Sequence, residues 1–163
     1  MFSKFTEEAR KVLIEAKKEM SELKHPYVGS EHLLLAILKN KNSRLAKKLK
    51  EYNLEYNEFK KEIIKIVGIG KDETEWFLYT PLLKKVIEDA IIESKEQNGD
   101  VTVENLFSSL IQGGEGIAIR VMLSMGVDFD DIIEKFSARL SNKKVTFIEL
   151  KEVCKLLRKA EIR

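Results

Sequence analysis

The feature of this sequence that most constrains its fold is an internal repeat. Three segments recur in the same order, the first at an offset of 74 residues and the other two at an offset of 73. The matched pairs are 5–16 with 79–90, 28–38 with 101–111, and 43–63 with 116–136. Each copy is roughly 65 residues long. A repeat of this length predicts a duplicated supersecondary unit, and two copies would pack with pseudo-two-fold symmetry.

Apolar residues recur at helical spacing through both copies, which predicts an all-α fold with four helices per copy. The composition agrees, because the 163 residues include two prolines and eight glycines and strong helix formers dominate. Thr6 is a natural N-cap for the first helix, and the pair His25-Pro26 ends it. The second helix begins at Gly29 or Ser30 and is apolar nearly all round, so we expect it to be buried.

The repeat divides the chain into four parts. We expect repeat 1 at 1–67, an inter-repeat linker at 68–78, repeat 2 at 79–141 and a C-terminal extension at 142–163. In the extension, Thr146 and Glu149 form a capping box ahead of an apolar stripe. This pattern predicts a ninth helix.

Charge, hydropathy and cysteine usage exclude several classes of protein. The net charge is +2, so neither nucleic acid nor an anionic membrane is an expected partner. Lys47, Lys48 and Lys50 belong to a stretch in which lysines and glutamates alternate, and we interpret them as a solvated face. No apolar run approaches the ~20 residues of a membrane span, and the N-terminus lacks a secretory apolar region. A single cysteine, Cys154, rules out an internal disulfide and fits a cytoplasmic protein.

No motif for catalysis, a cofactor or a metal ion is complete in this sequence. Residues 68–71, GIGK, are not a phosphate-binding loop, because Lys65 stands where a glycine is needed and Asp72 where a serine or threonine is needed. A structural zinc site normally uses four nitrogen or sulfur ligands, whereas this chain offers two histidines and one cysteine. His25 and His32 also lie on either side of a helix break, and we interpret His32 as a first-turn or packing residue. We therefore expect no enzyme, no cofactor and no metal site.

The linker carries two adjacent aromatic residues, Trp76 and Phe77. They either fill a groove between the copies or form an exposed anchor for a partner, since aromatic residues are enriched at interaction hot spots. We favour the groove, and the sequence leaves both interpretations open.

A glutamate stands at the start of the second helix in each copy, Glu31 in the first and Glu104 in the second. The helix dipole favours an acidic residue there without any function. Recurrence in both copies instead suggests a ligand site, although a shared capping role would also explain it. A third interpretation, in which the two carboxylates serve a small hydrolase, has no supporting motif.

Four segments in order, FTEEARKVL, HPYVGSEHLLLAIL, YTPLLKKVIEDA and GGEGIAIRVMLSMGV, resemble the N-terminal domain of the Clp chaperones, and best the ClpC type. These chaperones are AAA+ unfoldases that feed the Clp protease. The resemblance covers about residues 1–141 and implies an all-α fold of two four-helix repeats. It also implies a role in recognising client proteins and adaptor proteins, with the ATPase outside this chain.

The resemblance further implies candidate ligand residues, because each repeat of a ClpC-type domain can receive a phosphorylated arginine, a degradation mark. In repeat 1, Glu31 would take the guanidinium, and Thr6, with Lys4, would take the phosphate. In repeat 2 the counterparts are Glu104 and Thr80. Carboxylates suit guanidinium through paired charge-assisted hydrogen bonds, and a hydroxyl-capped helix start suits phosphate.

Two departures from the family pattern matter. Repeat 2 reads VTVEN, so that Val103 replaces a hydroxyl and Asn105 replaces a histidine, and its site is the weaker candidate. Residues 142–163 resemble an ordered helix, whereas a flexible linker and an ATPase follow this domain in the unfoldases. The chain is therefore either a piece of such an unfoldase or a free-standing protein. In the second case, its ligand sites are idle and its last helix docks a partner.

Overall fold

The computed structural model describes residues 4–71 and 77–136, and within these ranges the chain is helical. It divides into two compact units, Met1–Val127 and Asp128–Arg163. The helices of the first unit are α1 (Glu7–Glu22), α2 (Ser30–Lys39), α3 (Arg44–Lys50), α4 (Tyr56–Ile66), α5 (Pro81–Glu96), α6 (Val103–Gly113) and α7 (Ile117–Ser124). The second unit contributes α8 (Phe129–Phe136). The predicted all-α class is confirmed, while the expected ninth helix, Trp76 and Cys154 lie outside the described residues.

The two longest helices begin at the threonine caps that the sequence predicts. The Thr6 hydroxyl accepts a hydrogen bond from the Ala9 amide at 3.1 Å, and the Thr80 hydroxyl accepts one from the Leu83 amide at 3.1 Å. Each bond satisfies one of the amides that the first turn of a helix leaves without a partner. The caps therefore fix where α1 and α5 start.

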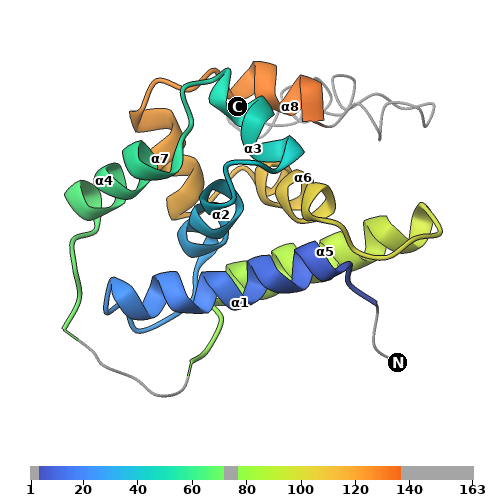
Figure 1. Ribbon diagram of the computed structural model, residues 1–163, viewed down its shortest axis with the longest axis horizontal. Coiled ribbons are helices and arrows are strands. Elements are labelled where there is room, and N and C mark those ends of the chain that lie inside the picture. The colour runs from blue at the N-terminus through green and yellow to red at the C-terminus, as the bar shows by residue number, and fades with distance from the viewer. Residues whose placement is uncertain (1–3, 72–76, 137–163) are drawn as a thin grey trace, which may run out of the picture. The chain divides into compact units, whose positions relative to one another are not determined.

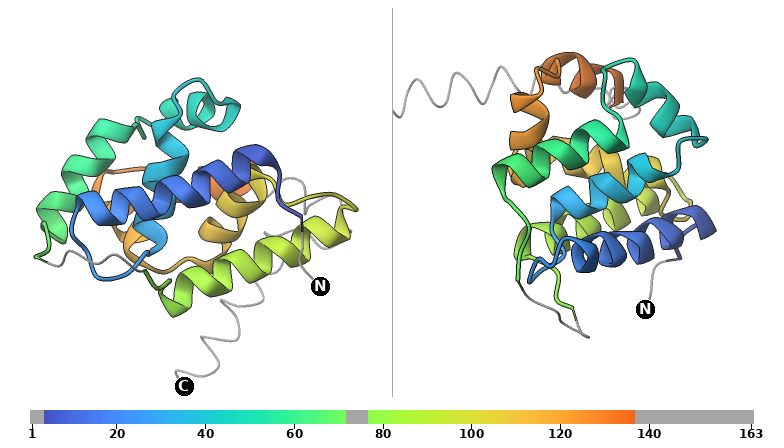
Figure 2. Two further views of the ribbon diagram at one scale, coloured as in Figure 1. Left: turned by 60° about the horizontal axis from the view of Figure 1, so that its bottom comes forward. Right: turned by 60° about the vertical axis from the view of Figure 1, so that its left-hand side comes forward.

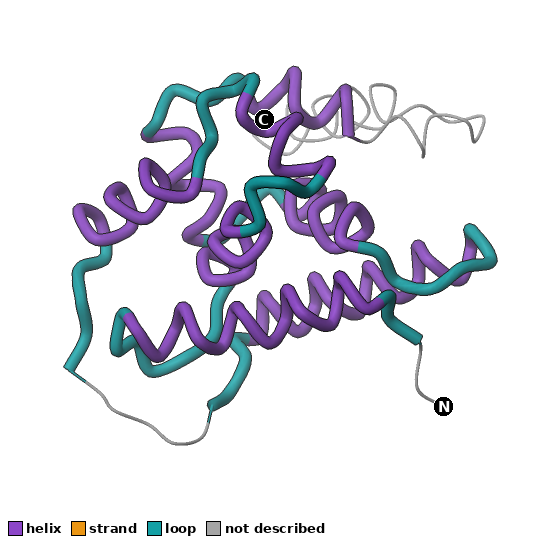
Figure 3. Tube along the Cα trace, in the orientation of Figure 1, coloured by secondary structure: helices purple, strands orange, loops and turns teal. Residues whose placement is uncertain are grey.

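Helix α2 lies at the centre of the first unit. All of its residues from Ser30 to Leu38 are buried, which confirms the prediction made from its apolar run. It packs against α1, α3, α4, α6 and α7. In Figure 1, α1 and α5 lie below α2 and α6, α3 lies above α2, and α4 and α7 lie to the left. Figure 3 distinguishes these helices from the loops that join them.

The two copies of the repeat are joined crosswise. The segment before α1 pairs with the segment before α6 through an isolated bridge between Phe5 and Val101. The segment before α2 pairs in the same way with the segment before α5, through a bridge between Val28 and Tyr79. The two bridges join equivalent positions of the repeat, as the expected pseudo-two-fold arrangement requires. Figure 2 shows the same arrangement of helices from two further directions.

Residues 68–71, GIGK, pack against the turn between α1 and α2 and hold it in place. The Gly70 amide donates to the Leu23 carbonyl at 2.8 Å. A Cβ atom at Gly70 would stand 1.9 Å from the Lys24 carbonyl oxygen, so only glycine fits this close approach. Further along the chain, Phe77 is half-buried, and the Lys17 ammonium of α1 lies 3.8 Å from the centre of its ring. Among the described residues, no helix combines the length and apolar character needed to cross a membrane.

Candidate functional site

Glu31 is a buried carboxylate in the first turn of α2, with a relative exposure of 5%. Burial raises the pKa of this carboxyl group, against smaller lowering effects from its own backbone amide and from His25. A Cβ atom at Gly29 would meet its Oε1 atom at 2.1 Å, so the glycine gives the carboxylate room to fold over the helix start. Within the described part of the chain, no lysine or arginine forms an ion pair with Glu31. The site therefore holds a desolvated acid that no described lysine or arginine neutralises.

Two helix starts from the second copy meet the start of α2. The Thr80 amide, at the start of α5, donates to the Val28 carbonyl at 2.9 Å. The Ala118 amide, in the first turn of α7, donates to the Ser30 hydroxyl at 3.3 Å. Helix starts carry partial positive charge, so this region offers an anion a favourable environment beside the Glu31 carboxylate.

Gly116 makes the close approach of α7 possible. Its φ angle is +105°, and a Cβ atom there would stand 2.9 Å from the Ser30 hydroxyl oxygen and 2.4 Å from Leu82 of α5. A side chain at this position would separate the three helix starts. Neither Gly116 nor Ser30 was predicted from the sequence to belong to the site. The signal that was missed is a glycine next to a helix that has no side-chain cap.

The equivalent region of the second copy is built from different residues. Glu104 occupies the same place in the first turn of α6 but is only half-buried. The Thr6 amide donates to the Val101 carbonyl at 2.9 Å, so the start of α1 meets the start of α6. Val103 stands in place of Ser30 and has no hydroxyl to accept a hydrogen bond. Glu104 is thus less desolvated than Glu31, and the hydrogen bond that the Ser30 hydroxyl accepts has no counterpart at Val103.

The backbone contacts group the expected site residues across the copies and not within them. The family resemblance implied that Thr6 and Lys4 act with Glu31, and Thr80 with Glu104. The structure instead joins the Thr80 segment to the strand-like residues before α2, and the Lys4–Thr6 segment to those before α6. The physical reason is the crosswise pairing, which sequence spacing within one copy does not reveal.

His25 and His32 form a buried chain of hydrogen bonds beside Glu31. The Gly29 amide donates to His32 Nδ1 at 2.9 Å, so the remaining proton of a neutral His32 sits on Nε2. This nitrogen lies 2.8 Å from His25 Nδ1, and His25 Nε2 lies 2.8 Å from the Gly68 carbonyl. One set of neutral tautomers therefore satisfies every bond in the chain. His32 is a first-turn residue, as expected, and its direct contact with His25 was not foreseen.

Burial, with a smaller effect of the nearby His25 in the same direction, lowers the pKa of His32 to about 3. His32 is thus neutral at physiological pH, and its Nδ1 atom, 4.0 Å from Glu31 Oε1, forms neither an ion pair nor a hydrogen bond with it. His32 therefore does not neutralise the Glu31 charge.

His25, Glu31 and His32 also form the kind of cluster that can hold a metal ion, because one possible ligand atom from each lies within 4.8 Å of the others. Both imidazole acceptor nitrogens already receive hydrogen bonds, from Gly29 and from His32. A metal would have to displace these bonds, so this arrangement fits a hydrogen-bonded pair better than a ligand set.

Comparison with known proteins places this architecture among relatives. A family model for the Clp repeat (R) N-terminal domain matches residues 4–98. The chain is 37% identical over 131 residues to the chaperone protein ClpB of Oceanobacillus iheyensis. It is 36% identical over 131 residues to the negative regulator of genetic competence ClpC/MecB of Bacillus subtilis. Each alignment covers 80% of this chain and 16% of the relative, so the chain spans about a sixth of the length of these relatives.

Solved structures share the fold at lower identity. The N-terminal domain of ClpD from Arabidopsis thaliana superposes with a TM-score of 0.68 at 20% identity, over 85% of this chain and 95% of that chain. The ClpV N-domain in complex with a VipB peptide superposes with a TM-score of 0.61 at 21% identity, over 88% of this chain and 91% of that chain.

Proposed function

We propose that this chain, which belongs to the Clp N-terminal domain family, is a recognition module that binds segments of client or adaptor proteins. A peptide complex of the ClpV N-domain, which has the same fold, supports such a role. We further propose that the module works together with AAA+ Clp machinery and catalyses no reaction itself.

The finer proposal is that the Glu31 region binds a phosphorylated arginine side chain. The observation that carries it is the buried Glu31 carboxylate, which has a raised pKa and forms no ion pair with a described lysine or arginine. A guanidinium group would neutralise this charge through paired hydrogen bonds and so recover the cost of burying it.

The helix starts around Glu31 suit the other half of the ligand. A phosphoryl group on the guanidinium places negative charge next to positive charge. The start of α5 at Thr80 and the start of α7 after Gly116 both meet the start of α2. Their amide groups and partial positive charge favour phosphate. Charge of both signs is therefore matched within one small region.

The proposed site thus combines Glu31 and Ser30 with Thr80 and Gly116. A second, weaker site would combine Glu104 with Thr6 and Lys4. Its glutamate is half-buried and keeps more of its hydration, so it has less to gain from a guanidinium.

Calorimetric titration with free phosphoarginine tests the proposal. The variants are Glu31→Gln and Glu104→Gln, which remove charge and keep shape, and circular dichroism checks that both stay folded. We expect Glu31→Gln to abolish the tighter binding event and Glu104→Gln to leave it in place. Arginine and inorganic phosphate are matched ligands that each carry one half of the recognition, and each should bind more weakly.

Failure of the folded wild type to bind phosphoarginine would overturn the finer proposal. The broader proposal of a peptide-binding module would then stand on the family match, and a peptide from a client protein would be the next ligand to titrate.

A further inference from the structure

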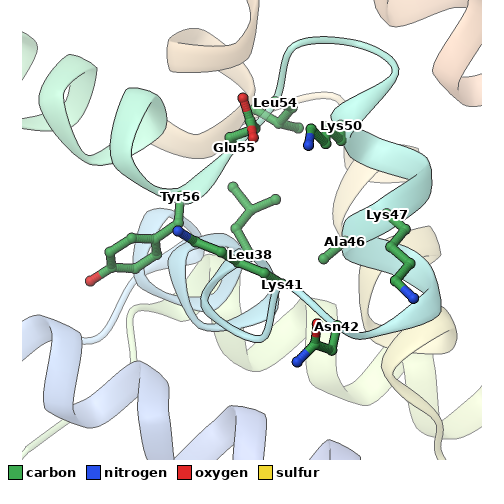
Figure 4. Close-up of a pocket in the computed structure, with 9 residues that line it drawn as sticks. All are labelled: Leu38, Lys41, Asn42, Ala46, Lys47, Lys50, Leu54, Glu55 and Tyr56. Carbon is green, nitrogen blue, oxygen red and sulfur yellow. The ribbon is translucent and has the colours of Figure 1, made fainter.

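A surface pocket lies at the opposite end of α2 from Glu31. Its volume is about 300 Å³, and the end of α2, α3 and the start of α4 surround it (Figure 4). Leu38, Ala46 and Leu54 line the pocket, and all three are at most 7% exposed. Glu31 and Leu38 both lie on α2, at its start and near its end, so at ~1.5 Å per residue the two regions are separated by about 10 Å along its axis.

The rim of this pocket is strongly basic. Lys41, Lys47 and Lys50 line it, against a single acidic residue, Glu55. All three lysines are exposed, and none forms an ion pair with another described residue. From the sequence, Lys47 and Lys50 were expected on a solvated face among alternating lysines and glutamates. The structure instead gathers them with Lys41 around an apolar floor, which leaves an excess of positive charge there.

Tyr56 lines one side of the pocket, and a hydrogen bond holds its side chain in place. Its hydroxyl group donates a hydrogen bond to the buried carboxylate of Glu19 on α1. Lys39 and Lys60 stand within 3.6 Å and 3.8 Å of the same carboxylate, so its charge is compensated. Glu19 therefore does not cancel the positive charge of the three lysines at the rim of the pocket.

We propose that this pocket binds an acidic segment of a partner protein, with one apolar side chain on the floor and flanking carboxylates on the lysines. The apolar floor and the volume suit a single side chain, and the charge of the rim suits carboxylates on either side of it. This inference does not rest on the phosphoarginine proposal, because the two ligands would be held by different residues at different ends of α2. One module would then read two segments of different chemistry at the two ends of one buried helix.

The test is a nuclear magnetic resonance titration of the full chain with a nine-residue capped peptide, in which a central leucine is flanked by two glutamates on each side. Two matched peptides carry glutamine in place of glutamate or alanine in place of leucine. We expect saturable shifts at the amides of Ala46, Lys50 and Tyr56. Both matched peptides should bind more weakly, and added salt should weaken the acidic peptide most.

Paired variants distinguish binding in the pocket from a general effect of net charge on affinity. The double variant Lys47→Glu/Lys50→Glu should lower affinity for the acidic peptide by at least about tenfold. The control Lys61→Glu/Lys65→Glu changes net charge equally on the exposed face of α4, where both lysines are more than 70% exposed. It should change affinity by less than about twofold. Ala46→Leu, which adds volume to the floor and no charge, should also weaken binding.

Three results would overturn the proposal: no saturable shifts at millimolar peptide, equal losses in both double variants, or equal binding of the glutamine peptide. A ten-nucleotide single strand that shifts the same amides as strongly would reassign the pocket to nucleic acid. Phosphoarginine binding by the Lys47→Glu/Lys50→Glu variant should be unchanged, so the two proposals fail independently.

Discussion

At the scale of single residues, Glu31 costs the folded state more than an exposed glutamate would. Burial raises its pKa, so the folded state holds this proton more tightly than the unfolded chain does. The stability that the group contributes is present at pH values below its unfolded pKa and is lost as pH rises through the raised folded pKa. A cationic ligand reverses this cost. Residues that bind a ligand commonly reduce stability in this way.

His32 provides a sharper test, because the second copy supplies its natural replacement. Asn105 occupies the equivalent position and accepts the same capping bond, from the Thr102 amide at 2.9 Å. His32→Asn should therefore keep the cap of α2 and lose only the bond to His25. At neutral pH we expect the variant to be less stable by about 1 kcal/mol.

The pH dependence follows from the direction of the His32 shift. Its pKa falls from 6.5 to about 3 on folding, so the unfolded chain binds a proton between these values that the folded chain does not. Stability is lost as pH falls through this window, by about 1.4 kcal/mol per pH unit well below 6.5. Urea unfolding from pH 7.5 to 4.5 should show that the gap between wild type and His32→Asn closes and then reverses. A constant gap would mean that His32 titrates freely in the folded state.

At the scale of elements, the burial of α2 predicts that substitutions in it reduce stability. Leu34 is 0% exposed, whereas Leu123 of α7 is 54% exposed. Leu34→Ala should lower the free energy of unfolding by about 2–5 kcal/mol, because it leaves a cavity among helices that cannot fully close it. Leu123→Ala should change it by about 0.5 kcal/mol or less. Chemical denaturation of both variants checks this order, and a reversed order would place α2 at the surface.

The elements were largely predictable from the sequence because their signals are local. Threonine caps at Thr6 and Thr80 and the apolar run after Ser30 depend only on residues within one or two turns of a helix. The crosswise grouping of the site was not predictable in the same way. It depends on backbone pairing between Val28 and Tyr79, which are far apart in the chain and are marked by no residue pattern.

The same limit applies to the histidine pair and to the basic pocket. His25 and His32 flank a helix break, and only the tight turn held by Gly70 brings their rings together. Lys41 and Lys50 look like ordinary surface lysines in sequence, since periodicity on one helix says nothing about the neighbouring helix. Contacts that join different helices are thus the part that sequence spacing leaves undetermined.

At the scale of the whole molecule, the crosswise pairing means that each proposed phosphoarginine site needs both copies of the repeat. Two matched variants test this. Thr6→Val and Thr80→Val each remove one capping bond of 3.1 Å, so each should cost a similar stability of about 1 kcal/mol. They differ in the site that they touch.

The decisive comparison uses backgrounds in which one glutamate has been neutralised. With Glu104→Gln present, only the Glu31 site remains, and Thr80→Val should weaken phosphoarginine binding while Thr6→Val should not. With Glu31→Gln present, the Glu104 site remains, and the effects of the two threonine variants should exchange. Calorimetry on the four double variants measures this directly. If Thr6→Val instead weakened binding at the Glu31 site, each site would lie within one copy, and the backbone pairing would have no part in recognition.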